Sequence, residues 1–323
     1  MSGAPPPGRT LLLAEHPFRD LLSQALLTAL RADLVRGAED APLLVHPTIG
    51  ELPAGFEAVA PGVDPRTLGV TQVILAGVFL ERRALEAALS MAAKALTVGA
   101  KFTVRNFGVE GDAALRAAPE GGRVLDRAER IDLRDHQTAN VLTQWRLLVP
   151  LEINPYPERH VAAESTLATL LPARPVLGLA IRSGAEMRAS WQPRLPALKR
   201  LLARAAGWPI LPLPVQGPGD PGDDMAGTKA FAEAVFDATT LLMPRLSDHA
   251  WWRRELTAPR LKGLVARCAL LVTNRDLVAA YAVAAGVPVI GIALGTDRRI
   301  ISCLAALANE LPEGSDLTHP LLS

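Results

Sequence analysis

Three arginines stand close behind apolar segments in the second half of the chain: Arg182, Arg275 and Arg299. A guanidinium donates paired hydrogen bonds to phosphate or carboxylate oxygens. The helix expected to begin near Asp276 adds the positive end of its dipole beside Arg275. Ligands of open α/β sheets bind outside the carboxyl ends of the strands, so these positions indicate a site for a small anion. The alternative is that the arginines simply pair with neighbouring aspartates, Asp276 or Asp297.

Two polar positions in the first half also follow expected strands. Asn106 opens the loop expected over 106–111, after a strand over 101–105, and Arg134 follows a strand over 130–133. We expect both to bind substrate, by the same rule for strand ends. The 106–111 loop lacks the G-x-G-x-x-G spacing of dinucleotide sites. The chain also has no Walker A sequence and no G-x-S-x-G elbow.

Few residues could transfer protons. His249 follows Asp248, which could orient its ring, and precedes the pair Trp251–Trp252. We expect His249 or Asp276 to act as general acid or base, with an ordinary loop or helix-start histidine as the alternative reading of His249. The tryptophan pair could stack on a sugar ring or simply pack in the protein.

Metal sites are not expected. The six histidines show no H-E-x-x-H spacing, and the two cysteines, Cys268 and Cys303, form no C-x-x-C pair. Both cysteines lie in apolar segments, so we expect buried, reduced thiols. The cluster Asp220, Asp223 and Asp224 is expected to form a solvated turn.

Composition limits the function classes. With 34 Lys+Arg and 33 Asp+Glu the net charge is +1, which argues against general nucleic-acid binding. Hydrophobic residues make up 49% and charged residues 21%, so the chain is not of the disordered class. The start, MSGAPPPGRT, is too polar and proline-rich for a signal peptide, and no apolar stretch is long enough to span a bilayer. We therefore expect a cytoplasmic protein.

Apolar runs alternate with helix-like segments along the whole chain, a pattern typical of parallel sheets wrapped by helices. Prolines gather between 152 and 175. We predict two Rossmann-like, doubly wound α/β domains, at 1–152 and 175–323, joined by a linker at 153–174. Strands are expected over 9–14, 43–45, 71–77, 101–105, 130–133, 175–182, 209–215, 240–246, 269–273 and 287–292. Helices are expected over 19–34, 81–99, 136–148, 192–207, 229–238, 259–267, 276–285 and 300–308.

Four segments resemble, in order, the polysaccharide pyruvyl transferase family: 101–111, 128–142, 176–182 and 263–308. In the last, Arg275 matches the family arginine, Gly286–Ile290 (GVPVI) matches its next strand, and Asp297 matches its aspartate. Arg299 stands where the family has a lysine. The family histidine is replaced by Leu277, which cannot move a proton.

The resemblance implies a GT-B-like arrangement, with an acceptor-side first domain and a donor-side second domain. It implies transfer of pyruvyl from phosphoenolpyruvate to a sugar of a cell-surface polysaccharide precursor, with no cofactor and with a saccharide acceptor that could be lipid-linked. The arginines would hold the donor. Two alternatives stay open: a glycosyltransferase using a nucleotide-sugar donor, for which Asp297 or Glu186 would have to hold the ribose, and a non-catalytic relative that binds an anionic ligand.

Overall fold

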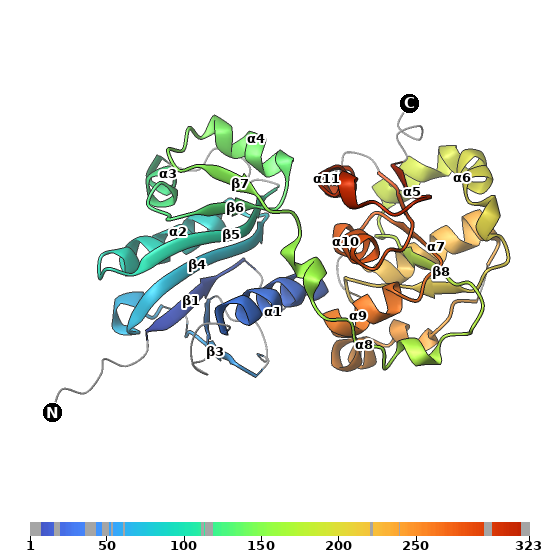
Figure 1. Cartoon of the computed structure of the whole chain (residues 1–323), viewed down its shortest axis with the longest axis horizontal. Coiled ribbons are helices and arrows are strands. Elements are labelled where there is room, and N and C mark those ends of the chain that lie inside the picture. Colours follow the sequence, from blue (N-terminus) through green and yellow to red (C-terminus); the bar gives the residue numbers. More distant parts are fainter. Residues whose placement is uncertain are drawn as a thin grey trace. The chain divides into compact units, whose positions relative to one another are not determined.

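A computed structural model shows two compact α/β units (Figure 1). It describes residues 8–15, 20–35, 43–46, 52, 54–60, 62–110, 113, 119–219, 222–238, 240–293 and 299–317. The first unit contains Met1–Arg19 and Leu26–Pro157, and the second contains Asp20–Ala25 and Glu158–Ser323. The chain thus divides after Pro157, inside the stretch 153–174 predicted as a linker. The acceptor and donor roles of the two units stay predictions.

The first unit is built on a seven-stranded parallel sheet in the order β3-β2-β1-β4-β5-β6-β7. The first strand lies between β2 and β4, which is the Rossmann order extended by one strand. Its strands are β1 (Arg9–Leu13), β2 (Leu43–His46), β3 (Phe56–Ala58), β4 (Val70–Phe79), β5 (Lys101–Val109), β6 (Ile131–Leu133) and β7 (Leu151–Ile153). Its helices are α1 (Leu21–Val35), α2 (Arg82–Leu96), α3 (Pro119–Leu125) and α4 (His136–Gln144).

Both faces of this sheet are covered. Leu11 and Leu13 of β1 pack in one apolar cluster with Leu85 and Leu89 of α2, whereas Leu12 between them packs in another with Leu27 of α1. Successive side chains of a strand point to opposite faces, so the two clusters lie on opposite sides of the sheet. Strands buried on both faces read as continuous apolar runs, which is why β1 and β4 are recognisable in the sequence.

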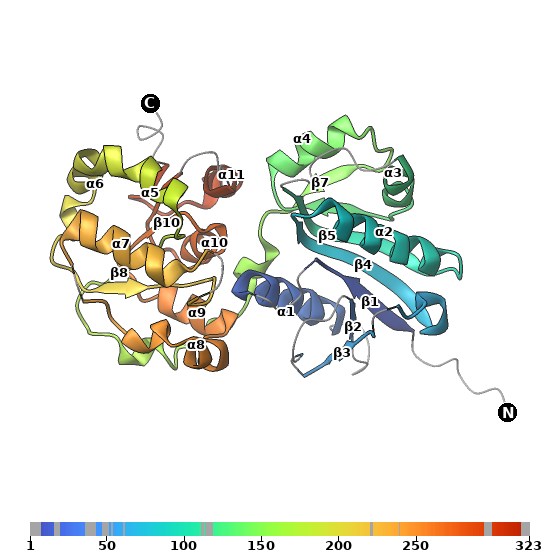
Figure 2. The same cartoon turned by 180° about the vertical axis from the view of Figure 1, so that it is seen from behind.

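The second unit is built on a five-stranded parallel sheet in the order β12-β11-β10-β8-β9. Its strands are β8 (Leu177–Ala180), β9 (Ile210–Pro212), β10 (Leu270–Thr273), β11 (Val289–Gly291) and β12 (Asp316–Leu317). Its helices are α5 (Ala185–Trp191), α6 (Leu195–Leu201), α7 (Asp224–Phe236), α8 (His249–Glu255), α9 (Ala258–Val265), α10 (Asp276–Ala284) and α11 (Arg299–Ala306). Figure 2 shows α7 running across the face of β8.

Helices α5, α6 and α7 supply one side of the second core. Trp191, Leu198 and Phe231 pack there against Leu177 and Leu179 of β8. The rings of Trp191 and Phe231 meet edge to face, with centroids 5.5 Å apart, a geometry that aromatic pairs favour. This packing fixes α5 and α7 beside the carboxyl end of β8.

Several predicted elements are wrong. The helix expected over 192–207 is replaced by a 3₁₀ turn at Gln192–Arg194, the short α6 and a second 3₁₀ turn at Ala203–Ala205. Pro193 and Pro196 have no backbone N–H to donate to a continuous helix. No strand forms over 240–246, where Pro244–Ser247 is a 3₁₀ turn. The loop expected from Asn106 is strand as far as Val109. Short strands at β3, β7 and β12, and helix α8, are absent from the sequence prediction.

Candidate active site at the carboxyl edges of the sheets

In the second sheet the first strand, β8, has β9 on one side and β10 on the other. Connections leave in opposite directions from these two sides, so the crevice between the ends of β8 and β10 is where such sheets bind ligands. The two strand ends are tied together there. Asn274, after β10, accepts the Arg182 backbone N–H on Oδ1 at 2.9 Å, and the Thr273 hydroxyl donates to the Ala180 carbonyl at 2.9 Å.

Arg275 lies at this crevice but is engaged within the protein. Its Nε donates to Asp224 Oδ1 at 2.8 Å, its Nη2 donates to the same oxygen, and Nη2 also donates to the Gly222 carbonyl at 3.0 Å. The Arg275 side chain is 10% exposed and that of Asp224 is 0% exposed. The arginine therefore clamps the start of α7 to the end of β10.

Asp224 is the residue that sequence reasoning misread. It is not in a solvated turn: its Oδ2 accepts the backbone N–H groups of Val215 and Gln216 at 2.8 and 2.9 Å, while Oδ1 accepts from Arg275. Neighbouring Asp223 does behave as a turn residue, because it caps α7 by accepting from the N–H groups of Met225 and Ala226. Nothing in the local sequence distinguishes these adjacent carboxylates, since the partner of Asp224 is 51 residues away.

Arg182 approaches Arg275 at Gly222. A Cβ built on Gly222 would lie 3.8 Å from Arg182 Cγ and 3.9 Å from Arg275 Nη2. The Arg182 side chain is half-buried, so part of it faces solvent. Arg299 begins α11 after β11, but Asp297 and the rest of 294–298 lie outside the described residues, as does the side chain of Glu186.

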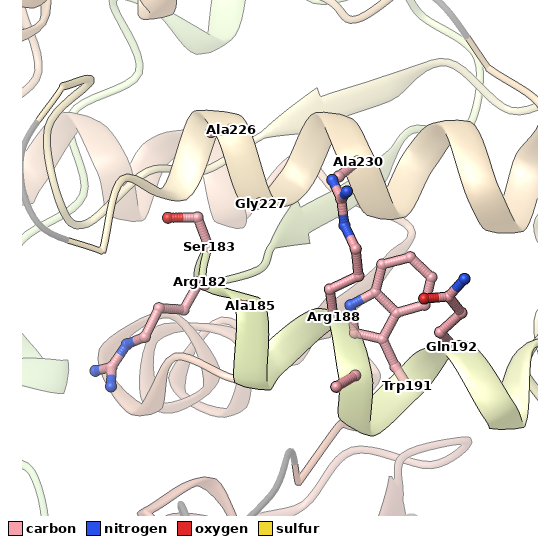
Figure 3. Close-up of a pocket in the computed structure, with 11 residues that line it drawn as sticks. Arg182, Ser183, Ala185, Arg188, Trp191, Gln192, Ala226, Gly227 and Ala230 are labelled. Carbon is pink, nitrogen blue, oxygen red and sulfur yellow. The ribbon is translucent and has the colours of Figure 1, made fainter.

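A cavity of about 450 Å³ opens beside the turn that follows β8 (Figure 3). It lies between α5 and α7, and it extends from Arg182 and Ser183 at the strand end to Trp191 and Gln192. Its remaining lining is Gly184, Ala185, Arg188, Ala189, Ala226, Gly227 and Ala230. A Cβ on Gly227 would lie 2.3 Å from the Ile181 carbonyl oxygen, so only glycine lets α7 pass this close to the turn.

The proton-transfer candidates lie in two places. His249 is exposed at the start of α8, with its ring stacked on Trp252 at a centroid distance of 6.1 Å. Asp248 caps α8 by accepting the Trp251 N–H at 3.1 Å, and within the described residues it makes no hydrogen bond to His249. Trp252 is packed in the protein, with Nε1 donating to the Pro214 carbonyl at 3.4 Å, so stacking on a sugar is left to half-buried Trp251.

Asp276 and Leu277 open α10 and are both buried. Asp276 Oδ1 accepts the Leu277 backbone N–H at 3.0 Å, and its carbonyl accepts from the Cys303 thiol at 3.5 Å. Leu277 is fully buried, as are its apolar neighbours in α10, so its side chain lies in the apolar interior of the second unit.

The first sheet has a corresponding switch point, the crevice between the ends of β1 and β4, from which the chain connections leave in opposite directions. The carboxylate of Glu15 lies there. Glu15 is buried and lies two residues after Leu13, the last residue of β1. Its Oε2 accepts hydrogen bonds from the backbone N–H groups of Leu80 and Glu81, the second at 3.2 Å. Sequence reasoning missed Glu15 as a candidate. The available signal was a carboxylate directly after the first predicted strand, the same rule that selected the arginines.

Asn106 lies inside β5 rather than after it. It is the extra residue of a β-bulge, because Arg105 pairs with Ala76 and Phe107 with Gly77. Its φ of 45° is left-handed, a conformation that asparagine tolerates better than most residues. A small cavity of about 20 Å³ lies beside it, lined in part by Arg105, Asp132 and Asn154. That volume is enough for roughly one water.

Arg134 is buried and faces another protein group. Its guanidinium carbon lies 4.7 Å from the ring centroid of fully buried Tyr156, close to the point where the chain leaves the first unit. A cation is attracted to the face of an aromatic ring, and this attraction is stronger when the two groups are removed from water. Among the predicted site residues, the structure therefore brings Arg182 and Arg275 together in the second unit, and it places Asn106 and Arg134 on β5 and after β6 in the first.

Two negative observations apply to the described part of the chain. It holds no group of three or more His, Cys, Asp or Glu side chains arranged to bind a metal ion. It also contains no helix with the length and apolar character needed to cross a bilayer.

Comparison with known proteins identifies the fold. No protein-family model matches the sequence, and no curated protein matches it. A UDP-GlcNAc 2-epimerase from Neisseria meningitidis, bound to UDP-GlcNAc, is similar in structure at 11% identity, over 97% of this chain and 89% of that one, with a TM-score of 0.52. A putative UDP-N-acetylglucosamine 2-epimerase from Listeria monocytogenes is similar at 9% identity, over 94% and 88%, with a TM-score of 0.51. Both have the GT-B fold, and the predicted GT-B-like fold class with two Rossmann-like domains is confirmed.

Proposed function

We propose that this chain is a sugar-modifying enzyme that binds a phosphate-bearing donor in its second unit, at the carboxyl end of β8. The observation that carries the proposal is the cavity of about 450 Å³ beside the β8 turn, with Arg182 and Arg188 in its lining. Guanidinium groups bind phosphate oxygens through paired, charge-assisted hydrogen bonds. The cavity adjoins the β8–β10 switch point, where doubly wound sheets bind their ligands.

Two donor classes fit this proposal. Phosphoenolpyruvate is the donor implied by the resemblance of four segments between 101 and 308 to polysaccharide pyruvyl transferases, and pyruvyl transfer to a polysaccharide precursor is the reaction that would follow. A nucleotide-linked sugar is the other, and the Neisseria epimerase of the same fold is bound to UDP-GlcNAc. Arg275 is held by Asp224, so in either case we assign anion recognition to the two arginines that line the cavity, Arg182 and Arg188.

Proton transfer needs a group other than Leu277. Glu15 is one candidate, since its carboxylate lies at the end of β1 in the first sheet, where such sheets bind ligands. His249 is the second candidate, because its ring is exposed. The buried Leu277 favours one further reading, a relative that binds the donor without turnover.

Equilibrium titration of the full chain tests the proposal. UDP-GlcNAc and phosphoenolpyruvate are compared with N-acetylglucosamine, which lacks phosphate. We expect saturable binding of at least one phosphate-bearing ligand, weakened about tenfold or more in Arg182→Ala, since a charge-assisted hydrogen bond contributes about 1.5–3 kcal/mol. Arg200→Ala, at an exposed position of α6, is the matched control and should bind as the wild type does. Absence of binding by every phosphate-bearing ligand at millimolar concentration would refute the proposal.

A further inference from the structure

We propose that one end of the first sheet is a docking surface for an anionic lipid bilayer. It lies at the amino ends of β5, β6 and β7, where the connections 97–100, 126–130 and 145–150 lead into the strands. We call it the amino-edge surface, and its members are Val98, Arg123, Arg127, Arg146 and Leu148. Glu15 lies at the other end of the strands, and the donor cavity belongs to the other unit. The inference therefore goes beyond the proposed function and does not depend on it.

Strand pairing brings these three connections side by side. β5, β6 and β7 are parallel neighbours in the sheet, so their amino ends share one edge. Asp126 Oδ1 accepts the backbone N–H of Leu148 at 2.5 Å, which joins two of the connections. A Cβ built on Gly122 of α3 would lie 3.9 Å from Leu147 Cδ2, and Figures 1 and 2 show α3 at the end of the sheet where β6 and β7 begin. Arg123 of α3 therefore lies close to the 145–150 connection.

Large apolar side chains are exposed along this edge. Leu148 is 86% exposed and Val98 is 53% exposed. Around Leu148, the side chains of Trp145, Leu147 and Val149 are half-buried and pack against the core of the first unit. The loop is thus anchored to the core while Leu148 projects from it. Transfer of that side chain out of water needs a surface that the described chain does not supply.

Three exposed arginines accompany these apolar side chains. Arg123, Arg127 and Arg146 form no ion pair with any residue that the structure describes. Asp126 offsets only one of their three charges, so they leave the edge positive. The other cations of this edge are already paired, as Arg130 with Glu152 and Lys101 with Glu129.

Arg146 occupies a backbone position that glycine usually fills. It follows Trp145, the residue that caps the end of α4, and its φ of 57° is left-handed. Helices often end with a residue in this conformation, and glycine is the usual choice because it has no Cβ to crowd the backbone. Backbone geometry therefore gives no reason for an arginine here. A cation next to Leu148 has a reason if the surface meets anionic groups.

A bilayer surface fits this combination of groups. Leucine enters the boundary between head groups and acyl chains, tryptophan is favoured at the level of the head groups, and arginines attract anionic lipids. A protein partner would have to supply a pocket for Leu148 surrounded by carboxylates, with the close shape match of a protein interface. An anionic membrane offers an apolar interior and a negative surface without any such match.

Co-sedimentation of the full chain with vesicles tests the proposal. The vesicles are phosphatidylcholine alone, or phosphatidylcholine with about 30% phosphatidylglycerol. The variants are Leu148→Asp and a triple variant in which Arg123, Arg127 and Arg146 are each replaced by alanine. Leu170→Asp is the matched control, because Leu170 is 70% exposed and belongs to the second unit. Thermal unfolding establishes that each variant is folded.

We expect the wild type to bind anionic vesicles about tenfold or more tightly than neutral ones, and to be released in about 1 M salt, where the Debye length is about 3 Å. Leu148→Asp should weaken binding about tenfold or more, because it removes an apolar side chain and adds a negative charge. The triple variant should weaken it about a hundredfold, since each basic residue near an anionic surface contributes about fivefold. Leu170→Asp should bind as the wild type does.

A second measurement locates the contact. Cys268 and Cys303 are both buried, so the thiol introduced by Leu148→Cys can be labelled selectively with an environment-sensitive fluorophore. Anionic vesicles should shift its emission to the blue and leave the same label on Leu170→Cys unchanged.

Three results would overturn the proposal. The first is no binding to anionic vesicles, and the second is binding that is unaltered in both Leu148→Asp and the triple variant. The third is self-association of the chain that Leu148→Asp abolishes, without any vesicle binding, which would assign the amino-edge surface to a second copy of this chain.

Discussion

Removal of the Arg275 side chain should cost the second unit much of its stability. In Arg275→Ala the Asp224 carboxylate stays fully buried, still accepting from Val215 and Gln216, but without its cation. Breaking a buried pair in this way costs about 3–5 kcal/mol. Folded domains have only about 5–15 kcal/mol of stability, so the loss is a large fraction of the total. Arg275→Lys should recover only part of it, since an ammonium cannot reproduce the guanidinium fork.

Urea unfolding monitored by tryptophan fluorescence measures the loss of stability in the second unit. Four of the five tryptophans, Trp191, Trp208, Trp251 and Trp252, belong to the second unit. If the free energy of unfolding falls by about 2 kcal/mol per molar urea, the midpoint urea concentration of Arg275→Ala should be lower than that of the wild type by roughly 1.5–2.5 M. A double-mutant cycle with Asp224→Asn should give a coupling of about 1–3 kcal/mol. An unchanged midpoint together with lost donor binding would show instead that Arg275 serves the ligand, as the sequence alone indicates.

Three further predictions follow from single sites. Gly227→Ala should lower the stability of the second unit by about 1–3 kcal/mol, because its Cβ would meet backbone atoms. Gly122→Ala should be neutral or stabilising, because its Cβ would have only Leu147 Cδ2 near it, at 3.9 Å. Thermal unfolding of the two variants measures the difference. Burial lowers the pKa of His46 below 6.5, so the unfolded chain binds more protons between the two values and stability should fall as pH decreases through 6.5; His46→Gln should flatten that slope. Burial raises the pKa of Cys268 to about 12, so this thiol should not react with a maleimide at pH 7.5 in the native chain. In the urea-unfolded chain it should react, and mass spectrometry detects the adduct.

The elements that the sequence predicts well are those buried on both faces. β4 contains the buried apolar run 73–76, β10 is buried throughout and apolar up to Thr273, and the regular apolar spacing of α1 predicts its helix. The edge strands β3 and β7 are only three residues long and partly exposed, so their residues carry no alternation to recognise. The bulge at Asn106 was also unpredictable, because a left-handed asparagine in a strand depends on both neighbouring strands.

The site was predictable in position more than in detail. The strand-end rule selected Arg182 and Arg275, and these do approach each other at Gly222. It could not show that Asp224 would neutralise one of them, since that contact depends on how α7 returns to the sheet. Nor could it find the α5–α7 cavity, which exists because Gly227 brings α7 close to the turn while Ala226 and Ala230 leave space beside it. Volume is a property of packing and has no local sequence signal.

Hydrogen–deuterium exchange of the full chain, with and without UDP-GlcNAc, tests the central claim most directly. Donor binding beside β8 predicts slower exchange in two segments that are distant in sequence, the turn and helix at 182–192 and the first turns of α7 at 224–230. Both effects should disappear in Arg182→Ala and persist in Arg200→Ala. Saturating ligand that protects other segments, and leaves these two unchanged, would contradict the account.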